Sequence, residues 1–470
     1  MPERRRVSPI IDRRGADSMR WHALRTDAKL GAFSRPGKDM AKLGAFWVRV
    51  RESLWFLPGL FTLLAVLLAL GTVALDELMV EGVADRPWLF GGGPEAALSV
   101  LGSIATSLIT VTGVTFSVTI VALQLASSQY TPRVLRNFTG DRSTQLVLGV
   151  FIATFTYALL IQRRIRIGEE GIDAFVPAIS VTIALFAVIV SIGFLIYFID
   201  HLARSIQASM IIQRATEDAR TLIDRQFPEA LGERTHIDSS WTSDEIPGEV
   251  RAYRAGYLQA VDELAIARLA GSQGLTVGME VRIGDFVLPD AVIASVWPSS
   301  GVSEEAVRRI RRAFVLGPER TLQQDVVHAL AELVDIAVRA LSPSVNDPET
   351  AKSCIDRLGE VLALFGQREF PPRLRTDDDD RVYMIARQIS YEEAVTTAFG
   401  PLRHFGADNP DVAIRLVETC KRVMRVLPRH RRGAVLAERD RIVAMARRTL
   451  GPEETEALMH AAGMSSHPGE

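Results

Sequence analysis

Hydrophobic and polar positions divide this chain into two unlike parts. Four apolar stretches separated by polar connections occupy residues 54–75, 96–126, 145–162 and 175–199, and most charged residues follow them. About 20 apolar residues in a helix cross the hydrocarbon core of a bilayer. We therefore predict an α-helical membrane protein with four transmembrane helices. The transmembrane domain is expected over residues 46–226, including a helical extension of the fourth span.

The second apolar stretch is unusual because it is rich in hydroxyl groups and carries no charged residue between positions 96 and 126. Small and hydroxylated side chains allow helices to pack closely, or line a wet path. Its candidates for lining a pore or packing against another helix are Ser107, Thr110, Thr112, Thr115, Ser117, Thr119 and Gln124. Thr131 as an N-cap before Pro132 predicts a short basic helix after this span.

Beyond the spans the periodicity changes. Gly, Pro and Ser interrupt residues 227–248, which we interpret as a linker. Residues 275–296 alternate apolar and polar positions around a Gly284-Asp285 turn signal, which predicts a hairpin. The hairpin is expected within a small β-rich domain over residues 249–320, barrel-like or sandwich-like. Residues 321–470 show mainly helical patterns. The soluble part is therefore expected to be a cytoplasmic α+β domain.

Charge and composition narrow the possible functions. The formal net charge is −2, so nothing favours binding to nucleic acid. Cys354 and Cys420 lie far apart and predict buried thiols rather than a disulfide or metal site. The sequence contains no recognisable catalytic grouping, phosphate loop or metal-ligand spacing. We expect no cofactor, no metal and no enzymatic activity.

Lysine and arginine beside the spans predict the orientation. They are concentrated before the first span, between the second and third, and after the fourth, which places both termini in the cytoplasm of a bacterial inner membrane. Residues 1–45 are basic and repeat the hexapeptide AKLGAF. A disordered tail, with Met1 or Met40 as the start, is favoured over a segment that touches anionic lipid.

The densest polar grouping lies within residues 320–351. It begins with the run RTLQQD at 320–325 and continues to Asp347, which is placed to cap a helix that starts at Pro348. Asp335 and Arg339 are four residues apart and can pair on one helix. Two interpretations remain: a structural helix-turn-helix, or a ligand or interface site formed by Asp335, Arg339, Ser342, Asn346, Asp347 and Thr350.

Four ordered motifs resemble a bacterial family of predicted membrane proteins, the domain of unknown function 2254. They are FSVTIVALQLASSQYTPRVLRNF, GYLQAVD, RIGDFV and LVDIAVRALSPSVNDPETA, and the similarity extends over about residues 52–427. The resemblance implies a four-span membrane domain with a cytoplasmic domain. It implies no activity, substrate or catalytic residue.

Two functional hypotheses follow. The first is a homo-oligomeric channel or pore-like protein, in which the second span lines the path and the cytoplasmic domain senses or gates. The alternative is a membrane scaffold or signalling protein that transports nothing and whose cytoplasmic domain binds a partner or small ligand. The expected surroundings are the lipid bilayer and other copies of the chain.

Overall fold

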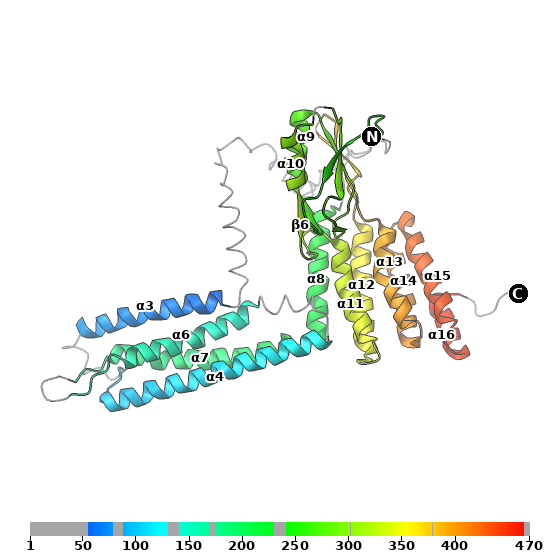
Figure 1. The fold of residues 1–470 in the computed structure, drawn as a ribbon. Coiled ribbons are helices and arrows are strands. Elements are labelled where there is room, and N and C mark those ends of the chain that lie inside the picture. Colours follow the sequence, from blue (N-terminus) through cyan, green and yellow to red (C-terminus); the bar gives the residue numbers. More distant parts are fainter. Residues whose placement is uncertain are drawn as a thin grey trace, which may run out of the picture.

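The computed structural model describes residues 55–78, 88–129, 141–168, 174–205, 207–229, 241–300, 302–377 and 379–464, with side chains from 125 to 129 left out. Figure 1 shows a bundle of long helices beside a C-terminal domain of helices and strands. The predicted basic tail and the predicted basic helix after Thr131 lie outside the described residues.

The membrane domain consists of α3 (Phe56–Leu78), α4 (Pro94–Gln129), α6 (Arg142–Gln162) and α7 (Ala178–Ser205). Each is long and apolar enough to cross a membrane, so the prediction of four spans is confirmed at that level. Helix α6 packs against α3, α4 and α7 and is the most buried of the four. Its Val147, Phe151 and Ile161 are fully covered in the core of this bundle.

The predicted helical extension of the fourth span is interrupted. Helix α7 ends at Ser205, Gln207 has an extended backbone, and a separate helix α8 (Ala208–Gln226) follows. Helix α8 packs against helices of the C-terminal domain, α11 (Val326–Ala340) and α12 (Pro348–Gln367). Its apolar face, including Ile211, Ala219 and Ile223, belongs to the core of that domain. The break lets α8 leave the direction of α7 and bury that face (Figure 1).

The strands form two open sheets, so of the two predicted forms of the β-rich domain, barrel-like or sandwich-like, the barrel is wrong. The five-stranded sheet has the order β1 (Gly248–Arg251), β5 (Val292–Trp297), β3 (Thr276–Met279), β8 (Val382–Ile385) and β7 (Leu374–Thr376). Only the β3–β8 pair is parallel. The three-stranded antiparallel sheet has the order β4 (Phe286–Val287), β2 (Gly256–Val261) and β6 (Phe314–Gly317).

The predicted hairpin around Gly284-Asp285 is also wrong. Strand β3 pairs with β5, whereas β4 pairs with β2 in the other sheet. The turn instead carries the chain from one sheet to the other, and Leu258 fixes it by donating to the Asp285 carbonyl and accepting from the Gly284 amide. Gly284 has a backbone φ of +91°, a conformation that residues other than glycine rarely adopt. The turn chemistry was therefore identified correctly, but not its strand partners.

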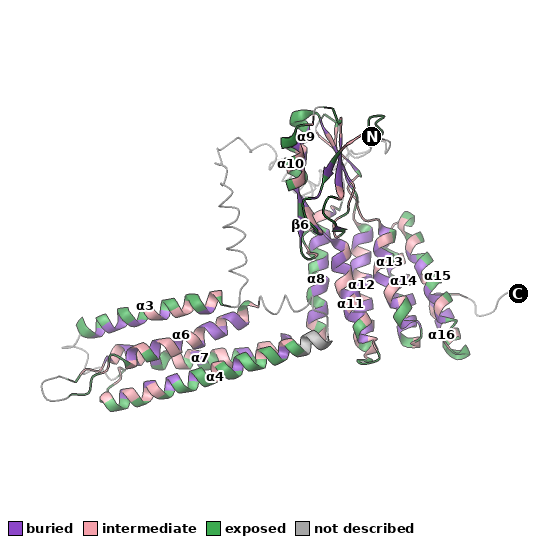
Figure 2. Ribbon diagram, viewed as in Figure 1, coloured by how far each residue is buried: buried purple, intermediate pink, exposed green. Residues whose placement is uncertain are grey.

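Helices complete the C-terminal domain. Helix α9 (Glu263–Gln273) packs against β8, and α10 (Glu304–Ala313) packs against α9, β1 and β6. Helices α8, α11 and α12 are followed by α13 (Tyr391–Gly406), α14 (Pro410–Val426), the short η3 (Arg429–Arg431), α15 (Arg432–Ala446) and α16 (Pro452–Ala462). These helices share one hydrophobic core (Figure 2). Cys354 and Cys420 are free and buried in it, as predicted.

Candidate functional site

Helix α4 presents polar and small side chains on the face that no other described part of the chain covers. At 3.6 residues per turn, these side chains lie within an arc of about 120°. They are Ser99, Ser103, Thr106, Ser107, Thr110, Gly113, Ser117 and Gln124, with the apolar Val114 and Val121 among them. On either side of this arc α4 also exposes the apolar Ile109, Phe116, Val118 and Ile120. The opposite face, including Leu101, Ile104 and Leu108, packs into the bundle core. The polar stripe therefore points away from the rest of the subunit.

The other outer helices provide a contrast. The exposed side chains of α3 are mainly leucines, among them Leu60, Leu64 and Leu67, and those of α7 include Phe186, Ile189 and Ile196. Such faces suit acyl chains. A hydroxyl-rich face on α4 does not, because helix surfaces of small and hydroxylated residues serve to pack against another helix or to meet water. We call this exposed arc the α4 polar face.

The seven predicted residues of α4 divide between its two sides. Ser107, Thr110, Ser117 and Gln124 lie on the α4 polar face. Thr115 is only 2% exposed, and Thr112 and Thr119 are half-buried towards the bundle. Thr110, Thr112 and Thr119 each donate to the carbonyl four residues earlier, at 2.6–2.8 Å. Their hydroxyls are thus satisfied within the helix and still present a lone pair to a neighbour.

A buried carboxylate joins α3 to α7. The carboxylate of Asp76 accepts hydrogen bonds from the Ile179 amide at 2.9 Å and from the Ser180 amide and hydroxyl at 3.0 and 2.6 Å. Through these hydrogen bonds Asp76, which is only 6% exposed, caps the amino end of α7 from another helix. The first apolar stretch was predicted to end at residue 75, just before Asp76, but α3 continues to Leu78 and so includes Asp76.

A polar cluster lies at the other end of the bundle. Asp141 caps α6 by accepting from the Ser143 and Thr144 amides, and it also pairs with His201 of α7 at 2.8 Å. The Tyr197 hydroxyl donates to Ser143 and its ring stacks on His201. His201 therefore ties the end of α7 to the start of α6.

The segment from Asp335 to Thr350 forms the end of α11, a tight turn and the start of α12. Asp347 accepts from the Thr350 amide at 3.0 Å and from the Thr350 hydroxyl at 2.6 Å. The side-chain hydrogen bond from Thr350 and, to a smaller extent, backbone hydrogen bonds lower the pKa of Asp347, against the opposing effect of burial. Asn346 has φ of +49°, and Ser342 donates to the Arg339 carbonyl. Asp347 is the helix cap that the sequence predicted. The Asp335–Arg339 pair stays a prediction.

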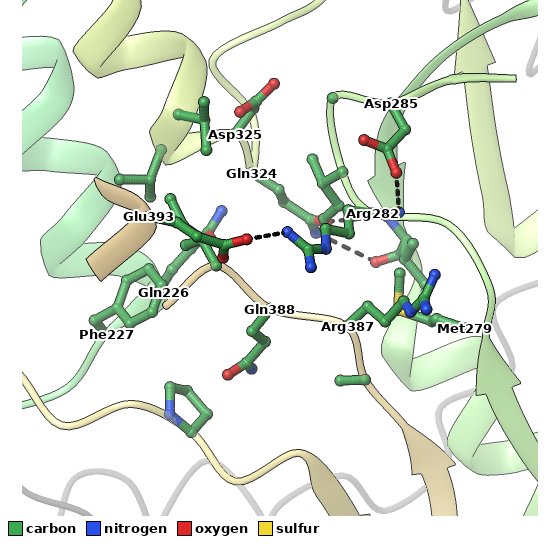
Figure 3. A pocket seen from close by; sticks show the side chains of 18 of the residues that line it. Gln226, Phe227, Met279, Arg282, Asp285, Gln324, Asp325, Arg387, Gln388 and Glu393 are labelled. Carbon is green, nitrogen blue, oxygen red and sulfur yellow. Dashed lines mark hydrogen bonds and ion pairs between the residues drawn. The ribbon is translucent and has the colours of Figure 1, made fainter. Parts of the chain in front are cut away.

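The sequence did not predict a cleft of about 820 Å³ between the sheets and the helices. One wall carries Arg282 to Asp285 and the chain after β8, and the other carries the end of α8 and the starts of α11 and α13. Figure 3 shows Arg282 and Glu393 meeting across it. The cleft lies where the RIGDFV motif meets the run RTLQQD at residues 320–325. The sequence had singled out both segments, but gave no other indication of a cleft.

Residues 320–325 contact both the RIGDFV motif and the GYLQAVD motif beside the cleft. Arg320 holds Asp325 through two hydrogen bonds of 2.7 and 2.8 Å, and Asp325 also caps α11. A Cβ at Gly284 would overlap this pair. Gln324 exchanges two hydrogen bonds with the backbone of Val261, in the GYLQAVD motif. In the part of the chain that the structure describes, no group of three or more His, Cys, Asp or Glu is arranged to hold a metal ion.

Comparisons with known proteins agree with this architecture. Uncharacterized proteins of Mycobacterium bovis and Mycobacterium tuberculosis are each 31% identical over 423 residues, which cover 87% of this chain and 79% of the relative. No solved structure matches the chain. The family model described as predicted membrane protein (DUF2254) matches residues 51–422. The chain therefore belongs to the DUF2254 family of predicted membrane proteins.

Proposed function

We propose that this protein is a homo-oligomeric channel or pore-like protein in which the α4 polar face lines the path. The observation that carries the proposal is the contrast between outer helices: the exposed side chains of α3 are mainly leucines, whereas α4 exposes an arc with Ser103, Thr110, Ser117 and Gln124 beside apolar residues such as Ile109 and Phe116. The three helices that pack around α6 enclose little space within one subunit. A path lined by α4 therefore needs several copies around one axis.

The chemistry of the α4 polar face favours permeation by ions or small polar solutes over proton relay. The described part of α4 carries no charged residue beyond Glu95 in its first turn, whereas proton relays use ionisable side chains within the membrane. Hydroxyl and carboxamide groups can replace part of the hydration shell of a solute. The proposal places the C-terminal domain in the bacterial cytoplasm, following the lysine and arginine bias, as a sensing or gating unit.

The alternative is a scaffold or signalling protein whose copies pack through α4 without a path. It is favoured by the Thr110 hydroxyl, which is already satisfied by the Thr106 carbonyl and so tolerates a dry contact. Both functions predict an oligomer. They differ in whether water reaches the α4 polar face.

Thiol labelling distinguishes the two functions. Burial raises the pKa of Cys354 and Cys420 to about 12, so the native thiols react slowly. We expect the reconstituted protein to conduct, and a membrane-impermeant thiol reagent to reduce the current of Thr110→Cys and Ser117→Cys. Leu67→Cys, on the exposed face of α3, is the matched control and should keep its current.

The contrary outcomes are distinct. Absence of current in the wild type, or currents that the reagent leaves unchanged in both α4 variants, refutes the proposed path. An oligomer that neither conducts nor reacts at Thr110→Cys supports the scaffold.

A further inference from the structure

We propose that the cleft between the sheets and the helices binds a small organic anion, with a carboxylate or phosphate held by Arg282 and Arg387 and an apolar body against Phe227 and Met279. This site is separate from the α4 polar face and does not depend on conduction. A cleft of about 820 Å³ between two structural units has the size and place typical of small-ligand sites.

Two of the four cleft arginines are committed to the structure. Arg320 is bidentate to Asp325, whose side chain is only 2% exposed, and the pair packs against Gly284. Arg375 has a 12% exposed side chain, contacts Glu263 at 3.4 Å and donates to the Pro372 carbonyl. These two guanidinium groups hold the cleft together and are not the ones a ligand reaches first.

Arg387 is the available cation. It is exposed, and its guanidinium donates through one nitrogen to the Glu280 carbonyl, which carries no formal charge. Within the described residues it forms no ion pair with a carboxylate. A guanidinium carries five N–H donors in a planar fork that suits carboxylate and phosphate oxygens. Most of the donors of Arg387 therefore remain to be used.

Arg282 forms an exposed ion pair that an anionic ligand can replace. Its partner Glu393 lies on the opposite wall, and their side chains are 47% and 42% exposed. Exposed ion pairs contribute little to stability, so a ligand anion can replace the Glu393 carboxylate on Arg282. Glu393 keeps its second role, because it also accepts from the Ser390 amide at the start of α13.

The carboxylates of the cleft do not cancel the preference of Arg282 and Arg387 for an anionic ligand. Asp325 is neutralised by Arg320, Glu393 takes part in the α13 capping box, and Asp285 accepts from the Arg282 amide in its own turn. Glu392 lies on the exposed first turn of α13. Its position makes a cationic ligand the competing outcome of the test.

The residues proposed to contact the anionic end and the apolar end of the ligand lie on the walls of the cleft. In Figure 3, Arg387 is beside Met279 on the sheet side, and Phe227 and Gln226 lie on the helix side, with Arg282 reaching between them. Phe227 is 5% exposed and stacks edge-on with Phe365, so this apolar wall is rigid. A bound anion would join the sheet wall to the helix wall where the Arg282–Glu393 pair now does.

Binding can be measured on the full chain in detergent by calorimetry and by thermal unfolding. The probes are adenosine monophosphate and inorganic phosphate for the phosphate arm, benzoate and citrate for the carboxylate arm, and putrescine as the cation. We expect saturable binding of at least one oxyanion and a higher unfolding temperature. Arg387→Gln and Arg282→Gln should each weaken it about tenfold or more, because a hydrogen bond between charged groups is lost.

Arg381→Gln is the matched control, since Arg381 is an exposed arginine outside the cleft, and it should bind as the wild type does. Arg387→Lys keeps the charge and provides a second variant if Arg387→Gln unfolds. The proposal is overturned if no oxyanion binds saturably to folded protein. It is equally overturned if binding survives both arginine variants, or if only putrescine binds and Glu392→Gln abolishes that binding.

Discussion

Asp347 shows how one side chain can fix a junction between two helices. It caps α12, immediately after Asn346 in a left-handed conformation, so the turn from α11 can close within a few residues. Both features are local, which explains why the sequence predicted the cap: Asp347, Pro348 and Thr350 are neighbours in the chain. A cap and its first turn need no information about the rest of the fold.

Asp347→Ala should lower the free energy of unfolding by about 1 kcal/mol at neutral pH, the usual effect of removing an N-cap. The pKa of Asp347 is lowered in the folded state, so its contribution is present above the ordinary pKa of about 3.9 and is lost as pH falls through the lower folded value. The difference between wild type and variant should therefore shrink on acidification. Unfolding by denaturant at a series of pH values measures it.

Ser344→Ala is the control for this prediction, because Ser344 is exposed and its hydroxyl contacts only Ser342 at 3.2 Å. It should change stability by less than about 0.5 kcal/mol at every pH. A difference for Asp347→Ala that grows towards acid would contradict the assigned role.

At the scale of elements, Asp76 is also a helix cap, like Asp347, but one that the sequence could not identify. Its partners Ile179 and Ser180 lie more than a hundred residues away, and nothing near Asp76 indicates that the start of α7 will meet it. The same limit explains the β-region. The Gly284 turn was recognisable from its residues, but its strands belong to different sheets because β3 finds β5 and β8, and β4 finds β2.

Helix α10 illustrates the opposite difficulty. Its apolar positions Ala306, Ile310 and Ala313 recur at helical spacing behind the Ser303 cap, so the sequence carries a clear helix signal. The prediction of a β-rich domain over residues 249–320 overlooked that signal. The long apolar spans were predictable because composition alone decides them. The cleft was not, because its lining residues come from six separate parts of the chain and only the fold brings them together.

Replacing Asp76 should loosen the α3–α7 contact. In Asp76→Ala the Ile179 and Ser180 amides lose their acceptor in a buried place, which costs about 1–3 kcal/mol for unsatisfied groups. We expect a lower unfolding temperature and faster proteolysis of the membrane domain in detergent. Asp76→Asn should have a smaller effect, because its carbonyl oxygen can still accept one hydrogen bond.

The neighbouring Glu77 is exposed, so Glu77→Ala is the matched control and should leave the unfolding temperature unchanged. Equal losses in Asp76→Ala and Glu77→Ala would mean that charge near the membrane surface matters, and not the cap on α7.

At the scale of the whole molecule, the subunit exposes mainly apolar side chains on α3 and α7, whereas α4 exposes a polar arc flanked by apolar residues such as Ile109 and Phe116. An isolated subunit would place Ser103, Thr110 and Ser117 against acyl chains, where their hydroxyls gain nothing from lipid. Association through α4 gives those groups protein or water as neighbours. The C-terminal domain has its own hydrophobic core, so in the proposed oligomer contacts through α4 would leave the proposed ligand cleft accessible.

The triple variant Ser103→Leu, Thr110→Leu, Ser117→Leu should therefore convert the assembly to smaller species in mild detergent, measured as mass by light scattering with the detergent subtracted. Leucine makes the α4 polar face resemble the exposed face of α3, and lipid or detergent then satisfies it without a partner. Leu60, Leu64 and Leu67, each replaced by isoleucine, form the matched control on α3 and should keep the wild-type mass. A wild type that is already monomeric would remove the basis for a path lined by α4, since a single bundle packed around α6 has no room for one. An unchanged oligomer in the leucine variant would instead move the subunit contact to another face.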